Sequence, residues 1–434
     1  MNIVHIIPGT GGNFYCQNCV RDLALVRALR AMGHEVVVIP MYLPLTGDDP
    51  SIETDAPVFF GAVNTYLHQH VPLYGRAPRW IKRMMDSDRM LKWASAKSGS
   101  TRAGGLEEMT LSMLRGEDGL QAASLDALVG WLARGNKPDV IHLSNGLLIG
   151  LARRIRAELG VPVVCSLQDE DAWIDAMEPR YAERVWQVVS DRAADVDVFV
   201  AVSRHYAGVM QKRIGVAEER MRVVRIGLKM DGYNQAPLYF RPPTLGYVSR
   251  MSESLGLGVL TEAFVRLKNR ESWLKGMRLR VTGGYTEDDR VLLEGLGERL
   301  TAIQMQGDVD FVAPFDEKHR LDFLQTLSVF SVPAPRGEAF GLHVLEALAS
   351  GVPVVQPAVG AFPELIGETG GGVLYDPSEI GEYIDALAGL LLNPDKAREM
   401  GRRGRSYVHE HFTVERMARE MAEVYKSVAR NWNV

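Results

Sequence analysis

RGEAFGLHVLEALASGVPVV, residues 336–355, is the stretch that decides the fold predicted for this chain. Glu338 precedes an expected helix, and Glu346 lies about two turns inside it. Eight residues of α-helix rise ~12 Å, which is an upper limit here because the first of them are expected to form a loop. A folded nucleoside diphosphate sugar separates its ribose from its hexose by a comparable distance. The spacing is therefore compatible with one carboxylate at each sugar.

The residues between the two glutamates would suit a phosphate. Backbone N–H groups of Phe340, Gly341 and Leu342 would lie at the helix N-terminus, where unpaired donors and the helix dipole attract anions. Gly341 would also let the backbone approach a ligand closely. Two unrelated acids on a helix surface would show the same spacing, and the spacing alone favours that simpler interpretation.

Short apolar, β-branched runs alternate with amphipathic stretches along most of the chain. This βαβ rhythm occurs in both halves and predicts an α/β protein with two parallel, doubly wound sheets. Such sheets bind ligands at the carboxyl ends of their strands. The expected strands lie at residues 2–7, 34–40, 139–143, 161–167, 196–202, 244–248, 277–283, 328–333 and 351–357.

The composition sets limits on size and partners. A chain of 434 residues is too long for one core, so two domains of about 200 residues each are expected. The 49 Lys and Arg against 54 Asp and Glu give a net charge of −5, which argues against nucleic acid as a partner. No apolar run reaches the ~18 residues of a membrane span. Three cysteines and a first strand in place of a signal peptide favour a cytoplasmic protein.

Several motifs together resemble the family-4 retaining glycosyltransferases, which have the GT-B fold of two Rossmann-like domains facing across a cleft. The most specific is GEAFGLHVLEALASGVPVV followed by GAFPELI and GGVLYDP. GTGG with LRAMGHEVVVI resembles the family's opening unit, and LGYVSRMSESLGLGVLTEAF resembles the start of its second domain. The resemblance covers most of the chain beyond residues 45–135.

The resemblance implies three parts of the chain. Residues 1–235 would form the acceptor-side domain, with a basic insertion at about 75–104. Residues 236–411 would form the nucleotide-sugar-binding domain, and residues 412–434 a helix that crosses back to the first domain. Pro237, Pro242, Pro243 and Gly232 break regular structure near the expected join.

The resemblance also implies a retaining transfer from a UDP- or GDP-sugar to an unknown acceptor, with no metal or other cofactor required. Glu338 would contact the sugar near its anomeric carbon, and Arg250 would stabilise the diphosphate as it leaves. Other donor contacts would come from Gly11, Gly12, Phe340, Gly341, Leu342 and, at the ribose, Glu346. The acceptor side would involve Asn145, Gln168 and Asp169.

Three positions depart from the family pattern. The family usually carries a lysine five or six residues after the arginine that matches Arg250, and Leu255 stands there. Arg336 and Lys229 are candidates for a substitute cation. Gln168 replaces a frequent histidine, and Ile226 replaces the asparagine of a frequent Asn-Gly turn. These changes leave the fold prediction intact and weaken the prediction of activity.

The cysteines allow three interpretations. Cys16 and Cys19 stand at C-x-x-C spacing at the start of the first expected helix, where thiol pKa values are lowered. With Cys165 and His142 they would suit zinc or an iron–sulfur cluster. The alternatives are a redox pair, and buried cysteines that pack as small apolar residues.

The sequence allows three functions other than sugar transfer. A dinucleotide oxidoreductase fits poorly, because Phe14 stands where the third glycine of the phosphate-binding motif belongs. A non-catalytic or weakly active sugar-nucleotide-binding or scaffolding protein is motivated by Leu255 and Gln168. A glycoside phosphorylase that uses inorganic phosphate remains a further alternative.

The basic segment 75–104 carries eight Lys and Arg against two Asp. On a helical wheel, apolar residues such as Trp80 and Met84 fall on one arc and basic residues such as Lys82 and Arg83 on the other. Such a helix can lie on an anionic membrane as a peripheral contact. The alternative is a helix that packs on its own domain with a solvated basic face.

Vesicle co-sedimentation separates these two interpretations. A peripheral contact predicts that the protein sediments with anionic vesicles at low salt and is released by salt, because counter-ions screen the attraction. Neutral vesicles are the control. Absence of binding to anionic vesicles at low salt would leave only the packed helix.

Overall fold

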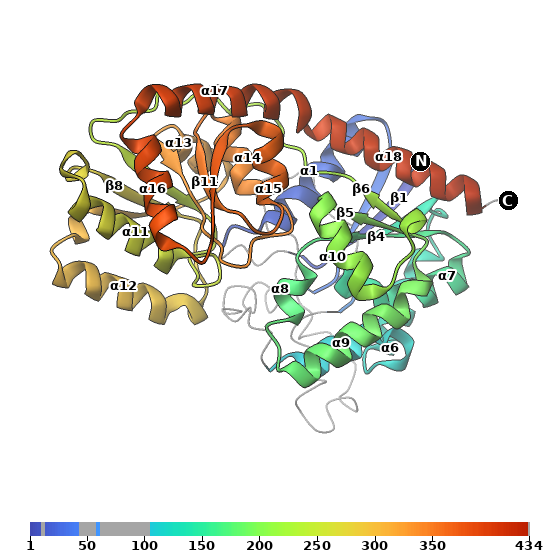
Figure 1. Cartoon of the computed structure of the whole chain (residues 1–434). Helices are drawn as coiled ribbons and strands as arrows, with labels where there is room; N and C mark the ends of the chain where they lie inside the picture. Colours follow the sequence, from blue (N-terminus) through green and yellow to red (C-terminus); the bar gives the residue numbers. More distant parts are fainter. Residues whose placement is uncertain (10–13, 43–57, 61–104, 433–434) are drawn as a thin grey trace. The chain divides into compact units, whose positions relative to one another are not determined.

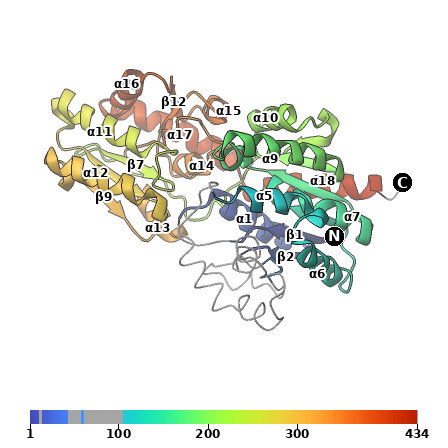
Figure 2. The same ribbon diagram turned by 90° about the horizontal axis from the view of Figure 1, so that it is seen from below.

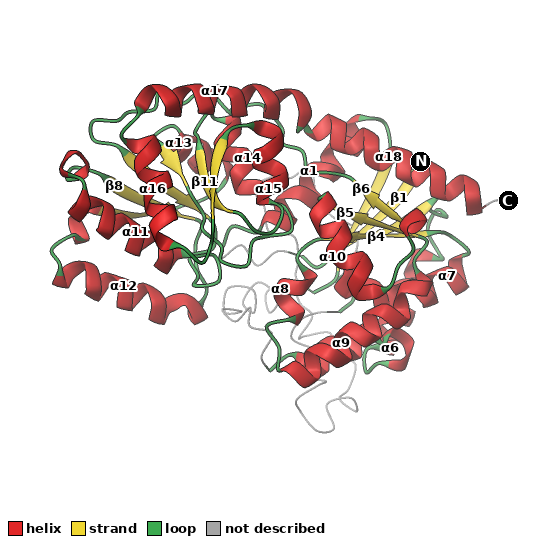
Figure 3. Cartoon of the chain, viewed as in Figure 1, coloured by secondary structure: helices red, strands yellow, loops and turns green. Residues whose placement is uncertain are grey.

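The computed structural model describes residues 1–9, 14–42, 58–60 and 105–432 (Figure 1). Two parallel sheets of six strands each organise these residues, with helices around each sheet (Figure 3). The predicted α/β architecture is confirmed. The basic segment 75–104 and the glycines Gly11 and Gly12 lie outside the described residues.

The first compact unit contains Met1–Gly12, Asn18–Arg225 and Met417–Val434. Its sheet has the order β2-β1-β3-β4-β5-β6, and all neighbouring strands are parallel. Every residue of β3 and β4 is buried, as expected for central strands covered on both faces. The strands are β1 (Asn2–Ile7), β2 (Glu35–Pro40), β3 (Val140–Leu143), β4 (Val163–Leu167), β5 (Val198–Ala201) and β6 (Met221–Val223).

Local signals set the ends of the helices in this unit. The Ser203 side chain accepts a hydrogen bond from the N–H of Tyr206 and so caps α10, which ends at Gly215 in the left-handed region. Helices α9 and α10 pack against each other (Figure 2). The helices are α1 (Gln17–Ala31), α5 (Glu107–Leu114), α6 (Ala122–Leu132), α7 (Ala152–Leu159), α8 (Glu170–Ile174), α9 (Pro179–Arg192), α10 (Arg204–Ile214) and α18 (Val414–Trp432).

The second compact unit contains Asn13–Gln17 and Ile226–Arg416. Its sheet has the order β12-β11-β10-β7-β8-β9 and is also parallel throughout. The strands are β7 (Thr244–Val248), β8 (Arg278–Thr282), β9 (Val309–Val312), β10 (Val329–Phe330), β11 (Val354–Pro357) and β12 (Gly372–Tyr375). The helices are α11 (Leu257–Arg270), α12 (Arg290–Ala302), α13 (Glu317–Leu324), α14 (Leu342–Ala349), α15 (Phe362–Thr369), α16 (Ile380–Leu391) and α17 (Pro394–His411).

Helix α14 positions the predicted site within the second unit. All eight of its residues are buried, because it packs beside the sheet and against α17. The helix begins at Leu342, so Glu338 lies in the preceding loop and Glu346 lies inside the helix. The predicted loop-to-helix junction therefore falls between the two glutamates.

Besides the short segment Asn13–Gln17, the chain enters the second unit at Ile226 and returns to the first unit after Arg416. The last helix, α18, is joined to β3 by a hydrogen bond of 2.7 Å between Tyr425 and His142. Among the described residues, no helix is both long and apolar enough to span a membrane.

Candidate active site

The two glutamates of the site are almost closed off from solvent. The side chain of Glu338 is 7% exposed and that of Glu346 is 3% exposed. Between them, Gly341 has a φ of 98°, and a Cβ there would lie 2.9 Å from the Phe362 ring. A glycine is therefore needed for this turn into α14.

Glu346 is held by three donors from three separate parts of the chain. Its Oε1 accepts hydrogen bonds from the Tyr233 hydroxyl at 2.9 Å and from Arg320 Nη2 at 3.1 Å. Its Oε2 accepts from the Tyr15 hydroxyl at 2.6 Å. Burial and the adjacent carboxylate raise the pKa of both tyrosines, so their hydroxyls stay protonated donors. A ribose diol at Glu346 would compete with these donors for the same carboxylate.

Gln17 occupies the other half of the site. Its Nε2 lies 3.2 Å from both carboxylate oxygens of Glu338. Its Oε1 accepts the backbone N–H of Leu342 at 2.6 Å, at the N-terminus of α14. One amide side chain thus bonds both to the acid predicted to meet the sugar and to a backbone donor predicted to meet the sugar and phosphate.

His343 lies beside Glu338, with its Nδ1 3.6 Å from the Glu338 Oε2. The imidazole is fully buried, and neither ring nitrogen makes a hydrogen bond to the described residues. Burial lowers the pKa of His343 to about 3, so the ring is neutral at ordinary pH. It therefore adds no positive charge beside Glu338.

Residues 14–17 as a group line this site in the second unit. Phe14 bridges to Gly284, and the N–H of Tyr15 donates to the Gly283 carbonyl at 2.7 Å. The Arg320 guanidinium lies 4.8 Å from the centre of the Tyr15 ring. Tyr15 and Gln17 were not among the predicted site residues. Their position directly after the glycine motif and around Cys16 was the available signal.

Arg250 is paired with a carboxylate. Its Nε lies 3.2 Å from the Asp289 Oδ2, and its guanidinium lies 5.8 Å from the centre of the Phe14 ring. Asp289 also accepts hydrogen bonds from the backbone and hydroxyl of Thr286. Asp289 was not among the predicted site residues. A diphosphate at Arg250 would have to share the guanidinium with this acid.

The candidate substitute cations differ in their surroundings. Leu255 is half-buried in the turn before α11. Lys229 is 66% exposed and pairs with Asp231 at 3.5 Å. Arg336 is exposed and stands two positions before Glu338 in the chain. Of the two cations, Arg336 is the one in the same loop as a site residue.

The predicted acceptor-side residues lie in the first unit, at the carboxyl ends of β3 and β4. Asn145 caps the short 3-10 helix Gly146–Leu151 by accepting the Leu147 N–H at 3.1 Å. Gln168 is buried, and its Nε2 donates to the Ser144 carbonyl at 2.6 Å. Asp169 has a φ of 63° in the left-handed region. Asn145 and Gln168 thus help to hold the loops together.

The Glu170 side chain anchors the same loops through hydrogen bonds. Its carboxylate accepts the N–H of Gly146 at 2.7 Å, the N–H of Gln168 at 2.8 Å and the hydroxyl of Tyr206 at 2.7 Å. Burial raises the pKa of Glu170 to about 7, although these hydrogen bonds lower it in part. Glu170 was not identified from the sequence.

The cysteines and His142 are engaged in other bonds. Cys16 and Cys19 are disulfide-bonded, whereas Cys165 is a free, buried thiol. His142 contacts Ser166 through Nε2 at 2.8 Å and Tyr425 through Nδ1 at 2.7 Å. Within the described part of the chain, no group of three or more His, Cys, Asp or Glu side chains is arranged to hold a metal ion.

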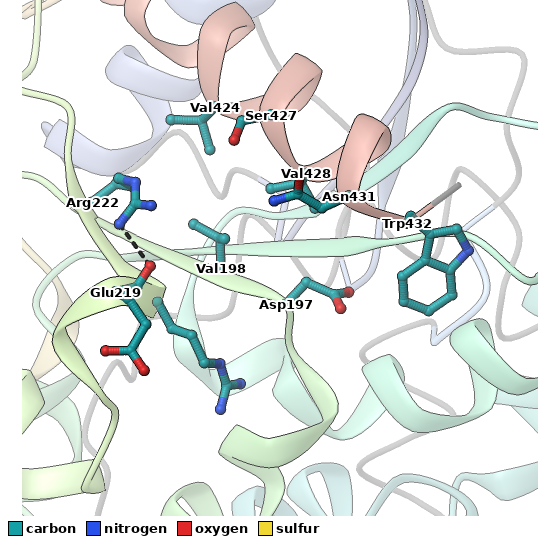
Figure 4. Close-up of a pocket in the computed structure, with 10 residues that line it drawn as sticks. Asp197, Val198, Glu219, Arg222, Val424, Ser427, Val428, Asn431 and Trp432 are labelled. Atoms are coloured by element: carbon teal, nitrogen blue, oxygen red, sulfur yellow. Dashed lines mark hydrogen bonds between the residues drawn. The ribbon is translucent and has the colours of Figure 1, made fainter. Parts of the chain in front are cut away.

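A cavity of about 240 Å³ lies elsewhere in the first unit (Figure 4). It is lined by Asp197, Arg222 and Trp432 among others, and Arg222 donates to the Glu219 carbonyl at 2.7 Å. Asp197 directly precedes β5, so this cavity is at the amino-terminal edge of the sheet. Ligands of doubly wound sheets bind at the opposite edge, and the cavity is therefore separate from the predicted acceptor side.

Comparison with known families agrees with this fold. Residues 20–227 match the model "Glycosyl transferase 4-like domain", and residues 234–407 match "Glycosyl transferases group 1". The chain belongs to these glycosyltransferases and has their GT-B fold.

Two distant relatives match over nearly the whole chain. The glycogen synthase of Mycobacterium tuberculosis is 24% identical over 94% of this chain and 90% of its own. The MMP alpha-(1->4)-mannosyltransferase of Mycolicibacterium hassiacum is 25% identical over 94% and 93%. Among solved structures, sucrose-phosphate synthase from Thermosynechococcus elongatus has a TM-score of 0.71 at 19% identity, covering 98% of both chains. HepE from Anabaena, in complex with UDP and glucose, has a TM-score of 0.67 at 16% identity, covering 98% of this chain and all of its own.

The buried Glu170 predicts a measurable pH dependence of stability. Its folded-state pKa of about 7 lies above the ordinary glutamate pKa of 4.5, so the stability that it contributes is complete below pH 4.5 and is lost as pH rises to about 7. The loss should reach about 3 kcal/mol for this shift. Chemical unfolding at pH 5 and pH 8 measures it.

Glu170→Gln is the matched variant, because it keeps the shape and removes the titration. Its unfolding free energy should fall less between pH 5 and pH 8 than that of the parent. The test is the pH dependence and not the absolute stability of the variant. The Gln amide N–H₂ group would face the hydrogen-bond donors that now bond to the Glu170 carboxylate, and this lowers stability at every pH. Parallel pH profiles for both proteins would contradict the assignment.

Proposed function

We propose that this glycosyltransferase moves a sugar from a UDP- or GDP-sugar to an acceptor with retention of anomeric configuration. The observation that supports it most is the placement of Glu338, the Leu342 N–H and Glu346 along one helix N-terminus within a single unit. The structure of HepE with UDP and glucose supports a uridine donor by analogy. The relatives of this chain include a glycogen synthase and a mannosyltransferase, so they do not determine which sugar is transferred or to which acceptor.

Each residue has a role in this proposal. Glu346 accepts the ribose hydroxyls, and Arg250 together with the backbone N–H groups of Phe340, Gly341 and Leu342 holds the diphosphate. Glu338 accepts hydrogen bonds from the transferred sugar. Contacts from Gly11 and Gly12 to the diphosphate, and from Asn145, Gln168 and Asp169 to the acceptor, rest on the resemblance of the sequence.

The proposed reaction is a displacement on one face of the sugar. The bond from the anomeric carbon to the diphosphate oxygen breaks, and a bond to the acceptor oxygen forms on the same face. The acceptor proton passes to the leaving phosphate oxygen. Positive charge develops at the anomeric carbon near the Glu338 carboxylate, and negative charge develops near Arg250, so both groups stabilise the transition state more than the ground state.

A cytoplasmic location and a peripheral membrane contact through residues 75–104 complete the proposal. Both rest on the sequence.

Isosteric amides test the roles of the two acids. Glu346→Gln should weaken UDP or GDP binding by about 1.5–3 kcal/mol, the scale of a hydrogen bond to a charged group. Glu338→Gln should lower kcat much more than donor affinity, because its contact lies at the reacting sugar. Calorimetry and donor hydrolysis provide the two measurements.

Thermal unfolding is the control for both variants, because Glu346→Gln leaves the buried Arg320 without its counter-charge. The ribose assignment is wrong if folded Glu346→Gln binds each nucleotide as tightly as the parent. The assignment of Glu338 is wrong if its variant loses donor affinity and keeps kcat.

A non-catalytic nucleotide-sugar-binding protein is the second candidate, and Leu255 is the observation that favours it. We propose instead that Arg336 supplies the second cation. Arg336→Ala should then reduce turnover about 10- to 100-fold, as expected for a charge that stabilises a leaving phosphate. Lys229→Ala is the matched control, because this exposed cation pairs with Asp231.

Leu255→Lys should change activity little if Arg336 holds the phosphate. Donor hydrolysis measured for the parent and the three variants decides the question. Full activity in Arg336→Ala, or an inactive parent that becomes active through Leu255→Lys alone, contradicts the substitute cation. Nucleotide binding without hydrolysis in every variant supports the second candidate.

A further inference from the structure

We propose that residues 14–17, which we call the plug, occupy the donor site, and that the redox state of Cys16 and Cys19 controls their release. This inference rests on the proposed function, because it takes Glu338, Leu342 and Glu346 as the groups that hold the donor. It adds a thiol-disulfide gate to that site.

The plug makes the bonds that the donor would make. The Tyr15 hydroxyl donates to the Glu346 Oε2 at 2.6 Å, in the place proposed for a ribose hydroxyl. The Gln17 amide nitrogen lies 3.2 Å from both oxygens of Glu338, in the place proposed for sugar hydroxyls. The Gln17 carbonyl oxygen accepts the Leu342 N–H, which would otherwise face sugar or phosphate. The side chains of Tyr15 and Gln17 therefore occupy three of the contacts proposed for the nucleotide sugar.

Further contacts, outside the two glutamates and Leu342, also hold the plug in place. The Tyr15 ring is buried beneath the Arg320 guanidinium, and its backbone N–H bonds to Gly283. Phe14 bridges to Gly284 next to it. These contacts keep the two polar side chains on the glutamates, so a nucleotide sugar must displace an ordered segment and not only water. Binding is then weakened by the fraction of molecules in which the plug is seated.

One of the two disulfide-bonded cysteines, Cys16, lies inside the plug. Cys16 stands between Tyr15 and Gln17, and with Cys165 free, Cys16 and Cys19 form the disulfide of the C-x-x-C motif. This bond closes a short covalent ring that includes Gln17, and the ring restricts the conformations that the segment can adopt when it leaves the glutamates. Disulfides in reducing compartments are usually transient and redox-sensing.

The switching step is a thiol-disulfide exchange with a dithiol reductant. The reductant is oxidised to its own disulfide, and two electrons and two protons pass to Cys16 and Cys19, which become two thiols. The plug then loses its covalent restraint. The donor replaces Tyr15 on Glu346 and Gln17 on Glu338, and the reduced protein is the binding form.

Nucleotide affinity in the two redox states tests the gate. Calorimetry with UDP and with GDP should show binding about 10-fold or more tighter after reduction by dithiothreitol, the scale of one displaced hydrogen bond to a charged group. The double variant Cys16→Ser with Cys19→Ser should bind like the reduced parent and should not respond to reductant. Cys165→Ala is the matched control and should respond like the parent.

Gln17→Ala separates a plug from a positioning residue. A plug predicts tighter nucleotide binding in this variant, because a competitor for Glu338 and Leu342 is removed. Weaker binding would mean that Gln17 positions these groups for the donor and would overturn the proposal. Hydrogen exchange gives a second readout, since the Tyr15 amide should exchange faster when nucleotide is added. Unchanged protection of residues 14–17 in the nucleotide complex also overturns it.

The outcomes distinguish the gate from the function on which it rests. Equal nucleotide affinity in oxidised parent, reduced parent and the cysteine double variant overturns the gate and leaves the donor site standing. Absence of UDP, GDP and nucleotide-sugar binding in all of these forms, including Gln17→Ala, overturns both.

Discussion

The buried carboxylate of Glu346 is the group on which the geometry of the candidate site depends. It sits in the middle of α14, a helix without a solvent-facing residue, so its charge must be balanced by protein groups. Removing such a charge from water costs several kcal/mol unless a counter-charge and hydrogen bonds offset the cost. Arg320, Tyr233 and Tyr15 provide these bonds, and they bring α13, the loop before β7 and the amino-terminal segment to the same carboxylate.

This constraint also explains why the site is occupied by the chain itself. Glu346 and Glu338 both accept hydrogen bonds here, and a buried carboxylate needs hydrogen-bond donors when no ligand supplies them. Tyr15 and Gln17 are suitable, because a phenol and an amide are neutral hydrogen-bond donors. They do not neutralise the carboxylates, and this role falls to nearby cations. A sugar nucleotide presents hydroxyls, which are neutral donors of the same kind. Ligand and plug are therefore interchangeable at the level of hydrogen bonds.

The sequence predicted the parts of the structure that depend on local pattern. Alternating apolar and amphipathic runs predicted two parallel sheets, and the helix expected after Glu338 begins at Leu342. Tyr15, Gln17, Arg320 and Asp289 could not be predicted in this way, because their partners lie far away in the chain. Tyr15 and Glu346 are 331 positions apart, and no periodicity links them. The disulfide of Cys16 and Cys19 is compatible with the redox pair, one of three interpretations that the sequence left open, because C-x-x-C spacing alone could not distinguish it from a metal site or from packed thiols.

The central claim is that a nucleotide sugar binds along α14, with its ribose on Glu346. The most direct measurement is a crystal structure of the reduced protein soaked with a non-hydrolysable UDP-sugar. The account predicts ribose hydroxyls within hydrogen-bonding distance of Glu346, sugar hydroxyls at Glu338, and Tyr15 and Gln17 moved away from both acids. A bound nucleotide elsewhere, with Tyr15 and Gln17 still on the two glutamates, would contradict it.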